Sequence, residues 1–293
     1  MILVFFIEPL GNILYSFVYI NEVGKEFLDM RYRSPGLTTA GGDGLSLIQA
    51  IFLIFGISAF LSDKEKHSIF SYALYIVSFV VLLLSIFLSG RTGFVIALYG
   101  IFVVFVFRNV RWHKFNSKFI ARNLYLLIFL VLFFVLSFFL FSQSEYIKLF
   151  SRVFEIVLNY VSSGDFSTSS SDDLGTMYFL PTQELILTFG DGNFGRFDQN
   201  LFIHSDVGYI RFIFGIGVFG TFIAFVAFSL ASLHGFISIK DYYVRFMVLF
   251  VSSSILIMNV KVLHFFGNAL GVKVFFLVLF LSALSKFKNN RSL

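Results

Sequence analysis

The sequence contains no cysteine, and only 13% of its 293 residues are charged. Without cysteine, neither a disulfide framework nor a thiolate metal site can form. Soluble domains carry roughly a quarter of charged residues, so a chain with a mean hydropathy of +0.88 is not suited to water. The sequence also shows no cluster of metal ligands, no P-loop, no serine-hydrolase elbow and no small-residue signal cleavage site. These absences leave an integral membrane protein as the expected class.

Long apolar runs dominate what is present, since 58% of the residues are hydrophobic and 20% are aromatic. The runs are separated by turns and lack strict alternation, which favours helices over an outer-membrane barrel. The sequence thus predicts an all-α polytopic membrane protein: one transmembrane domain, residues 1–293, with about eight transmembrane helices. The Gly93–Phe107 run is short for a bilayer of ~30 Å. The predicted spans are Met1–Ile20 (interrupted), Leu45–Leu61, Ile69–Leu88, Gly93–Phe107, Leu124–Phe141, Asp206–Leu230, Arg245–Val260 and Gly271–Ser285.

Basic residues in the loops predict the orientation, because they accumulate on the inner side of a membrane. With the C-terminal tail inside, the inner loops hold twelve Lys and Arg in short segments, and the outer side holds eight spread over more chain. This orientation makes residues 142–205 a large outer loop, which is acidic, and its middle, Ser162–Asp173, resembles a mobile linker. The net charge of +5 reflects these loops and does not indicate nucleic acid.

Charged residues gather where a polar loop, beginning at Asp191, passes into the apolar run that starts at Asp206. Such a cluster at a membrane mouth is a functional-site hypothesis, because charge is costly in hydrocarbon. A helix extended back by one turn would place His204 and Arg211 on one face. Asp206 has two readings, a helix N-cap or a catalytic carboxylate. The cluster consists of Arg196, Asp198, His204, Asp206 and Arg211.

Three further patterns have competing interpretations. Ser89–Gly93 is a tight turn whose Arg91 either snorkels to the interface or grips a phosphate through its planar guanidinium. Gly190–Gly195 matches GxGxxG but lacks the βαβ context of a dinucleotide site, so these glycines are expected to form a turn. Lys261 and His264 form a second candidate cation pair at the outer end of a span.

The LSGRTGF turn, the long outer loop and HSDVGYIRFIFGIGVFG together resemble the bacterial Wzy-type O-antigen and capsular polysaccharide polymerases, in the O-antigen ligase-like superfamily. Tyr32–Ser46 is also similar to a loop of that family. Family members usually have ten or more spans, so the chain is expected to be short at its N-terminus.

The resemblance implies a metal-independent glycosyltransferase without a cofactor, at the outer face of the bacterial inner membrane. It would transfer a sugar chain from undecaprenyl pyrophosphate to a hydroxyl on another lipid-linked repeat unit, with a chain-length regulator and a flippase as partners and no nucleic acid. Arg91 and Arg211, with Arg152, would neutralise the pyrophosphate. His204, or alternatively Asp206, would deprotonate the attacking hydroxyl.

Two alternatives stay open. An O-antigen ligase would use the same donor with a different acceptor. A flippase or other transporter would place polar groups near the membrane midplane on broken helices, and the interrupted first span and Lys273 fit that reading. The gathering of polar groups at the outer mouth favours an enzyme.

Reporter fusions test the orientation. A fusion after Ser170 is expected to report an outer location and a fusion after Lys114 an inner one, because the basic residues are concentrated in the inner loops. Paired alkaline phosphatase and green fluorescent protein fusions measure this. The reverse pattern would place His204 at the cytoplasmic side and remove the argument for an outer site.

Overall fold

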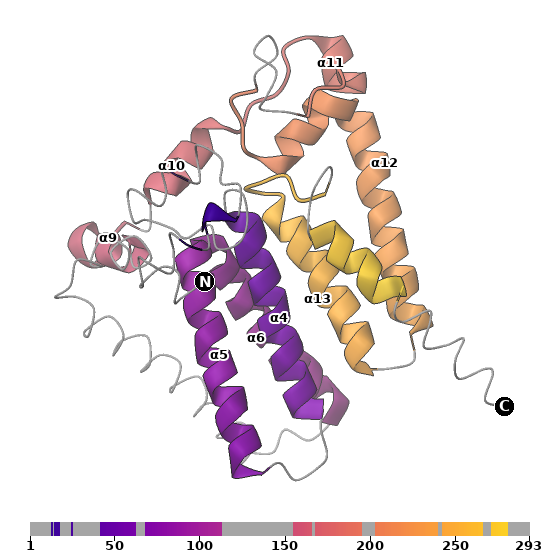
Figure 1. The fold of residues 1–293 in the computed structure, drawn as a ribbon. Coiled ribbons are helices and arrows are strands. Elements are labelled where there is room, and N and C mark those ends of the chain that lie inside the picture. Colours follow the sequence, from indigo (N-terminus) through magenta and orange to yellow (C-terminus); the bar gives the residue numbers. More distant parts are fainter. Residues whose placement is uncertain are drawn as a thin grey trace. The chain divides into compact units, whose positions relative to one another are not determined.

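The computed structural model describes residues 13, 15–17, 25, 42–62, 68–112, 155–165, 168–194, 203–239, 242–265 and 271–280. Within these residues the secondary structure is helical with no strand, which confirms the all-α prediction (Figure 1). The chain forms two compact units. The first comprises residues 1–54 and 67–168, and the second comprises residues 55–66 and 169–293.

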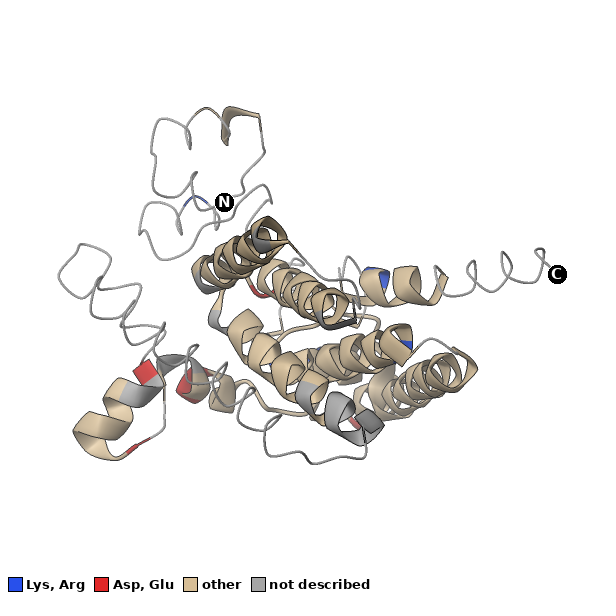
Figure 2. Ribbon diagram, turned by 90° about the horizontal axis from the view of Figure 1, so that it is seen from below, with Lys and Arg blue, Asp and Glu red and all other residues tan. Residues whose placement is uncertain are grey.

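Helices occupy the predicted spans that fall within the described residues. Two of them are long and apolar enough to cross a membrane, over Asp43–Phe60 and Gly208–Ser238. Shorter apolar helices cover Phe70–Ile86, Thr92–Val104, Tyr242–Met258 and Gly271–Phe280. The predicted span Leu124–Phe141 and most of Met1–Ile20 lie outside the described residues. Charged residues colour only short parts of the long helices in Figure 2, as expected for apolar spans.

Helices α4 (Asp43–Ser62), α5 (Ile69–Ser89) and α6 (Arg91–Trp112) belong to the first unit, apart from the C-terminal end of α4. Helix α6 has 22 residues, so it is about 33 Å long at 1.5 Å per residue. Its apolar part is nevertheless only Thr92–Val104, which agrees with the predicted short span from Gly93 to Phe107. Beyond this apolar part, the helix continues through Arg108 and Arg111 to Trp112.

Polar side chains join α4 to the α5–α6 turn. The Gln49 amide donates to Ser85 Oγ at 2.8 Å and accepts from Ser89 Oγ at 2.7 Å. Beyond the turn, Thr92 Oγ1 donates to Asp43 Oδ1 at 2.6 Å. Such bonds satisfy polar groups between apolar helices, where no water replaces them. The predicted tight turn is confirmed, since Gly90 alone separates α5 from α6.

Three short helices lie within the described part of the predicted outer loop, and the third of them, α11, is given below. Helix α9 covers Glu155–Ser163 in the first unit, and α10 covers Ser169–Thr176 in the second. The linker prediction for Ser162–Asp173 was therefore wrong from Ser169 onward. Asp172 lies in the first turn of α10, where a carboxylate interacts favourably with the amide end of the helix dipole.

Helix α12 (Gly208–Ser238) is interrupted at Gly217, where φ is 69° and ψ is 175°. The short helix α11 (Glu184–Phe189) packs against this break, as Figure 1 shows at the top of α12. The break frees carbonyls that a continuous helix would use, and two of them accept from the turn after α11. Asp191 N donates to Phe214 O at 2.8 Å, and Gly192 N donates to Gly215 O at 2.9 Å. Gly190 and Gly192 have positive φ, which confirms the predicted glycine turn at these positions.

Aromatic rings fill the second unit between α12 and the C-terminal segments. Phe265 contacts the rings of Phe212, Phe225 and Phe228 at centroid distances of 5.4, 4.9 and 4.7 Å. Helix α13 (Tyr242–Met258) is buried around most of its circumference in the same unit. At its start, Arg245 donates to Ile239 O through Nε and Nη2, so its guanidinium closes the C-terminus of α12.

Replacing Gly217 by alanine is expected to destabilise the protein strongly. The left-handed backbone alone costs about 1–2 kcal/mol with a Cβ, and that Cβ would collide with the carbonyl oxygen of Thr188. Gly56→Ala is the matched control, because nothing lies within 4 Å of the place that its Cβ would take and alanine favours a helix by up to about 1 kcal/mol. Thermal loss of the helical circular dichroism signal in detergent measures both variants. Equal midpoints would contradict a structural need for glycine at the break.

Candidate functional site

The segment Ile203–Val207 has no regular secondary structure, and it leads directly into α12. Ile203, Ser205 and Val207 are buried, whereas His204 is exposed and Asp206 is partly exposed. This alternation is typical of an extended chain, in which neighbouring side chains point to opposite sides. The helix does not extend back to His204, so His204 and Arg211 do not share a helix face, because Val207 is the N-cap residue with φ −60° and ψ 117°.

Ser205 anchors this segment through three hydrogen bonds. Its hydroxyl donates to Met177 O at 2.8 Å and accepts from Val207 N at 3.2 Å. Its carbonyl oxygen accepts from Arg211 Nε at 2.7 Å. A buried hydroxyl satisfied on both sides holds the backbone in one place, so the neighbouring side chains have defined positions.

Asp206 and Arg211 form an ion pair, with Oδ1 and Nη2 3.1 Å apart. The Arg211 side chain is 12% exposed and that of Asp206 is 31% exposed. The N-cap residue Val207 makes no side-chain capping bond, and the Asp206 carboxylate pairs one turn into the helix instead. Two predicted site residues therefore come together, and any anion that approaches Arg211 meets a carboxylate beside it.

The turn after α13 forms the other side of this region and depends on Asn259, which is fully buried. Its Oδ1 accepts from His264 N at 3.1 Å, its Nδ2 donates to Ile255 O at 2.8 Å, and its carbonyl accepts from Tyr209 N at 3.2 Å. Gly208 packs directly on it, since a Cβ there would lie 2.5 Å from Asn259 Oδ1. Asn259 thus ties the first turn of α12 to the end of α13.

Tyr178 connects the segment before α11 to the same turn. Its hydroxyl donates to Val260 O at 2.6 Å. Burial raises the pKa of the Tyr178 phenol above its ordinary value of 10, so the group stays protonated and remains a donor at neutral pH. Sequence analysis did not identify Tyr178 or Asn259, because their partners lie far away in the sequence or belong to the backbone.

The remaining predicted residues lie in the other unit, in the turn after α13 or outside the described residues. Arg91 is the first residue of α6 in the other unit. His264 is buried in the turn after α13, and Lys261, its predicted partner in a cation pair, is partly exposed. Arg152, Arg196 and Asp198 lie outside the described residues. Among the residues that the structure describes, no group of three His, Asp or Glu side chains could hold a metal ion.

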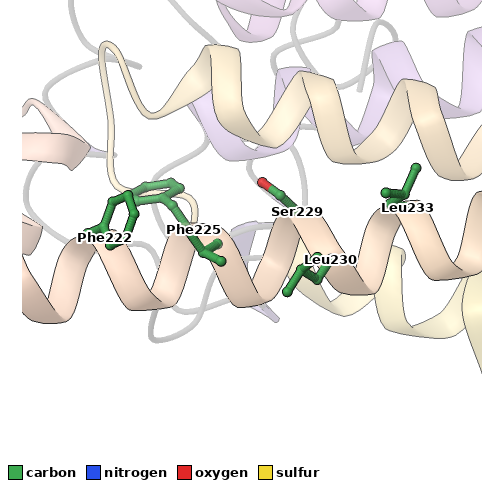
Figure 3. Close-up of a pocket in the computed structure, with 6 residues that line it drawn as sticks. Phe222, Phe225, Ser229, Leu230 and Leu233 are labelled. Atoms are coloured by element: carbon green, nitrogen blue, oxygen red, sulfur yellow. The ribbon is translucent and has the colours of Figure 1, made fainter.

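An open apolar groove of about 300 Å³ runs along the middle of α12 (Figure 3). Ser229 contributes the one polar side chain among the described residues that line it. Its size and apolar lining suit a hydrocarbon chain better than a sugar, because sugar hydroxyls would lack partners. The lining residues are Phe222, Phe225, Val226, Ser229, Leu230 and Leu233.

The chain matches no protein-family model, and no curated protein or solved structure is significantly similar to it. The resemblance to the polysaccharide polymerases therefore depends on the sequence motifs alone.

A double-mutant cycle tests the ion pair. Arg211→Ala and Asp206→Ala are expected to show a coupling of about 1 kcal/mol, more than most exposed pairs, because the guanidinium is largely buried. Arg211→Lys should lose nearly as much stability as Arg211→Ala, since an ammonium group cannot reach Ser205 O and Asp206 together as the planar group does. Thermal unfolding in detergent measures the cycle. Additive single effects would show that the pair contributes no stability.

Proposed function

We propose that the chain polymerises undecaprenyl-pyrophosphate-linked oligosaccharide repeat units by glycosyl transfer at the outer face of the bacterial inner membrane. It would do so as a multi-pass protein with about eight transmembrane helices and residues 142–205 as the outer loop. The observation that carries the proposal is the grouping of His204, Asp206 and Arg211 at the start of a long apolar helix. The polar cluster suits a polar acceptor, and the apolar helix suits a lipid-linked donor. A reaction between the two requires both features at one place.

His204 is the proposed general base, with Asp206 as the second candidate. The His204 ring is exposed, so an acceptor hydroxyl can approach it, and a neutral imidazole has one ring nitrogen that accepts a proton. The acceptor oxygen would attack the anomeric carbon while the bond from that carbon to the pyrophosphate oxygen breaks. The hydroxyl proton would pass to His204. The ion pair with Arg211 favours a positioning role for Asp206.

Arginines would stabilise the pyrophosphate as its charge develops. Arg211 is the main candidate. Arg91 and Arg152 are further candidates, because the motif resemblance implies them. The pairing with Asp206 fixes the plane of the Arg211 guanidinium, and a preorganised donor costs little reorganisation during the reaction. The groove on α12 would accept part of the isoprenoid chain. A chain-length regulator and a flippase are the expected partners.

An O-antigen ligase and a transporter are the alternatives. The break at Gly217 favours a transporter, because discontinuous helices supply carbonyl ligands in transporters. Here, however, the carbonyls of Phe214 and Gly215 already accept from Asp191 and Gly192. This use of the freed carbonyls within the protein favours the enzyme.

Substitutions at the two candidate bases test the proposal. His204→Ala is expected to abolish visible polymer in a complemented null strain, because a positioned base contributes ~10²–10⁴-fold in rate. Asp206→Asn should retain polymer, since its amide oxygen can still accept from Arg211. Polymer length on silver-stained gels is the measurement, with an epitope tag to verify normal protein levels.

The reverse outcome, polymer with His204→Ala but none with Asp206→Asn, would assign the base to the carboxylate. Normal polymer from both variants would remove catalysis from this cluster. The null strain lacks this protein. If that strain still forms polymer but does not attach it to the lipid A core, the protein would be the ligase.

A further inference from the structure

The segment around α11 exposes large apolar side chains that the proposed chemistry does not use. Leu185 is 73% exposed and Phe189 is 66% exposed, although both belong to a helix packed on α12. They are four residues apart, so they lie one above the other on one side of the helix. Leu180, just before α11, is also exposed.

Helix α11 has three different sides. Successive residues are turned by about 100°, so Glu184 and Thr188 share one side and Leu185 and Phe189 share the next. Glu184 and Thr188 are exposed and polar, whereas Ile186 and Leu187 are partly buried. A helix with one polar side, one packed side and one exposed apolar side is suited to the boundary between water, protein and lipid.

The break in α12 indicates where that boundary lies. After Gly217 the helix continues for 21 residues to Ser238, which is about 31 Å and long enough to cross the hydrocarbon by itself. Phe219 and Phe222, directly after the break, are 61% and 65% exposed. The stretch before the break carries Arg211 and follows Asp206, and an ion pair favours the headgroup region over hydrocarbon.

Helix α11 is fixed at the level of this break. The Thr188 carbonyl lies against Gly217, and the amides of Asp191 and Gly192 bond to α12 just before it. The ring of Phe179 also packs edge-on against Phe214, with centroids 5.8 Å apart. The exposed side of α11 is therefore held beside the first exposed apolar residues of the membrane-crossing part.

We infer that α11 is an interfacial anchor. Its Leu185 and Phe189 insert into the headgroup–acyl boundary of one leaflet, the hydrocarbon begins at Gly217, and the Asp206–Arg211 pair lies in the headgroup layer. The partner is a lipid surface, because Leu185 and Phe189 are exposed at the level of the break, where the exposed apolar residues of α12 begin. This inference depends on the membrane location in the proposed function, and not on its chemistry.

Single labelled cysteines test the anchor, since the chain has no cysteine of its own. Leu185→Cys and Phe189→Cys, each carrying the fluorophore NBD in phosphatidylcholine–phosphatidylglycerol vesicles, should be quenched by lipids with a spin label near the headgroup. Glu184→Cys is the matched control on the polar side and should be quenched by aqueous iodide. The ratio of lipid to iodide quenching is expected to be at least about threefold higher at 185 and 189 than at 184.

Labelled Phe222→Cys distinguishes a failure of the anchor from a failure of the membrane location. Lipid quenching at 222 together with iodide quenching at both 185 and 189 would overturn the anchor and leave the membrane location intact. Iodide quenching at 222 as well would overturn the membrane location, and with it the proposed function. Fluorescence unaffected by either quencher at 185 and 189 would mean that protein covers these residues, which also overturns the anchor.

Discussion

The second unit depends on the interruption of α12 at Gly217. Backbone groups in an apolar setting must find partners, because no water is present to supply them. The interruption removes helical partners from Phe214 O and Gly215 O, and the amides of Asp191 and Gly192 replace them. Only glycine fits there, since φ is positive and the Thr188 carbonyl occupies the place of a side chain. One backbone constraint therefore positions α11, the glycine turn and the first two turns of α12.

The polar residues at the start of α12 serve mainly to hold the backbone. Ser205 and Asn259 are buried and connect different segments: Ser205 bonds to Met177 and Arg211, and Asn259 bonds to Tyr209 and His264. Arg211 uses two of its donors on Ser205 and Asp206. Among the titratable side chains of residues 203–211, that of His204 is the exposed one. A reaction at this place would thus combine the accessible imidazole of His204 with the rigidly held guanidinium of Arg211.

This arrangement bears on the choice between an enzyme and a transporter. A transporter moves its substrate past freed backbone carbonyls, and here those carbonyls are already used within the protein. An enzyme requires rigid positioning of charge instead, because reorganising dipoles during a reaction is costly. The tight anchoring of Arg211 fits the second requirement better than the first.

Composition and local pattern were sufficient to predict most of the helical framework. Apolar runs from Leu45 to Leu61 and from Ile69 to Leu88 correspond closely to α4 and α5, because a run of about twenty apolar residues has few alternatives to a helix. The glycine turn at Gly190 and Gly192 was also predictable, since glycine readily adopts a positive φ. The sequence likewise identified Asp206 and Arg211 as candidates, through the cost of placing charge at an apolar run.

Tertiary structure decided how those residues are used. The start of α12 at Gly208, which excludes His204 from the helix, depends on the close packing of Gly208 on Asn259, about fifty residues later in the chain. The hydrogen bond from Tyr178 to Val260 spans 82 residues, and no periodicity within a short window contains that information. Local patterns report which conformation a segment prefers. The partner of a polar group far along the chain is determined only when the packed helices bring the two together.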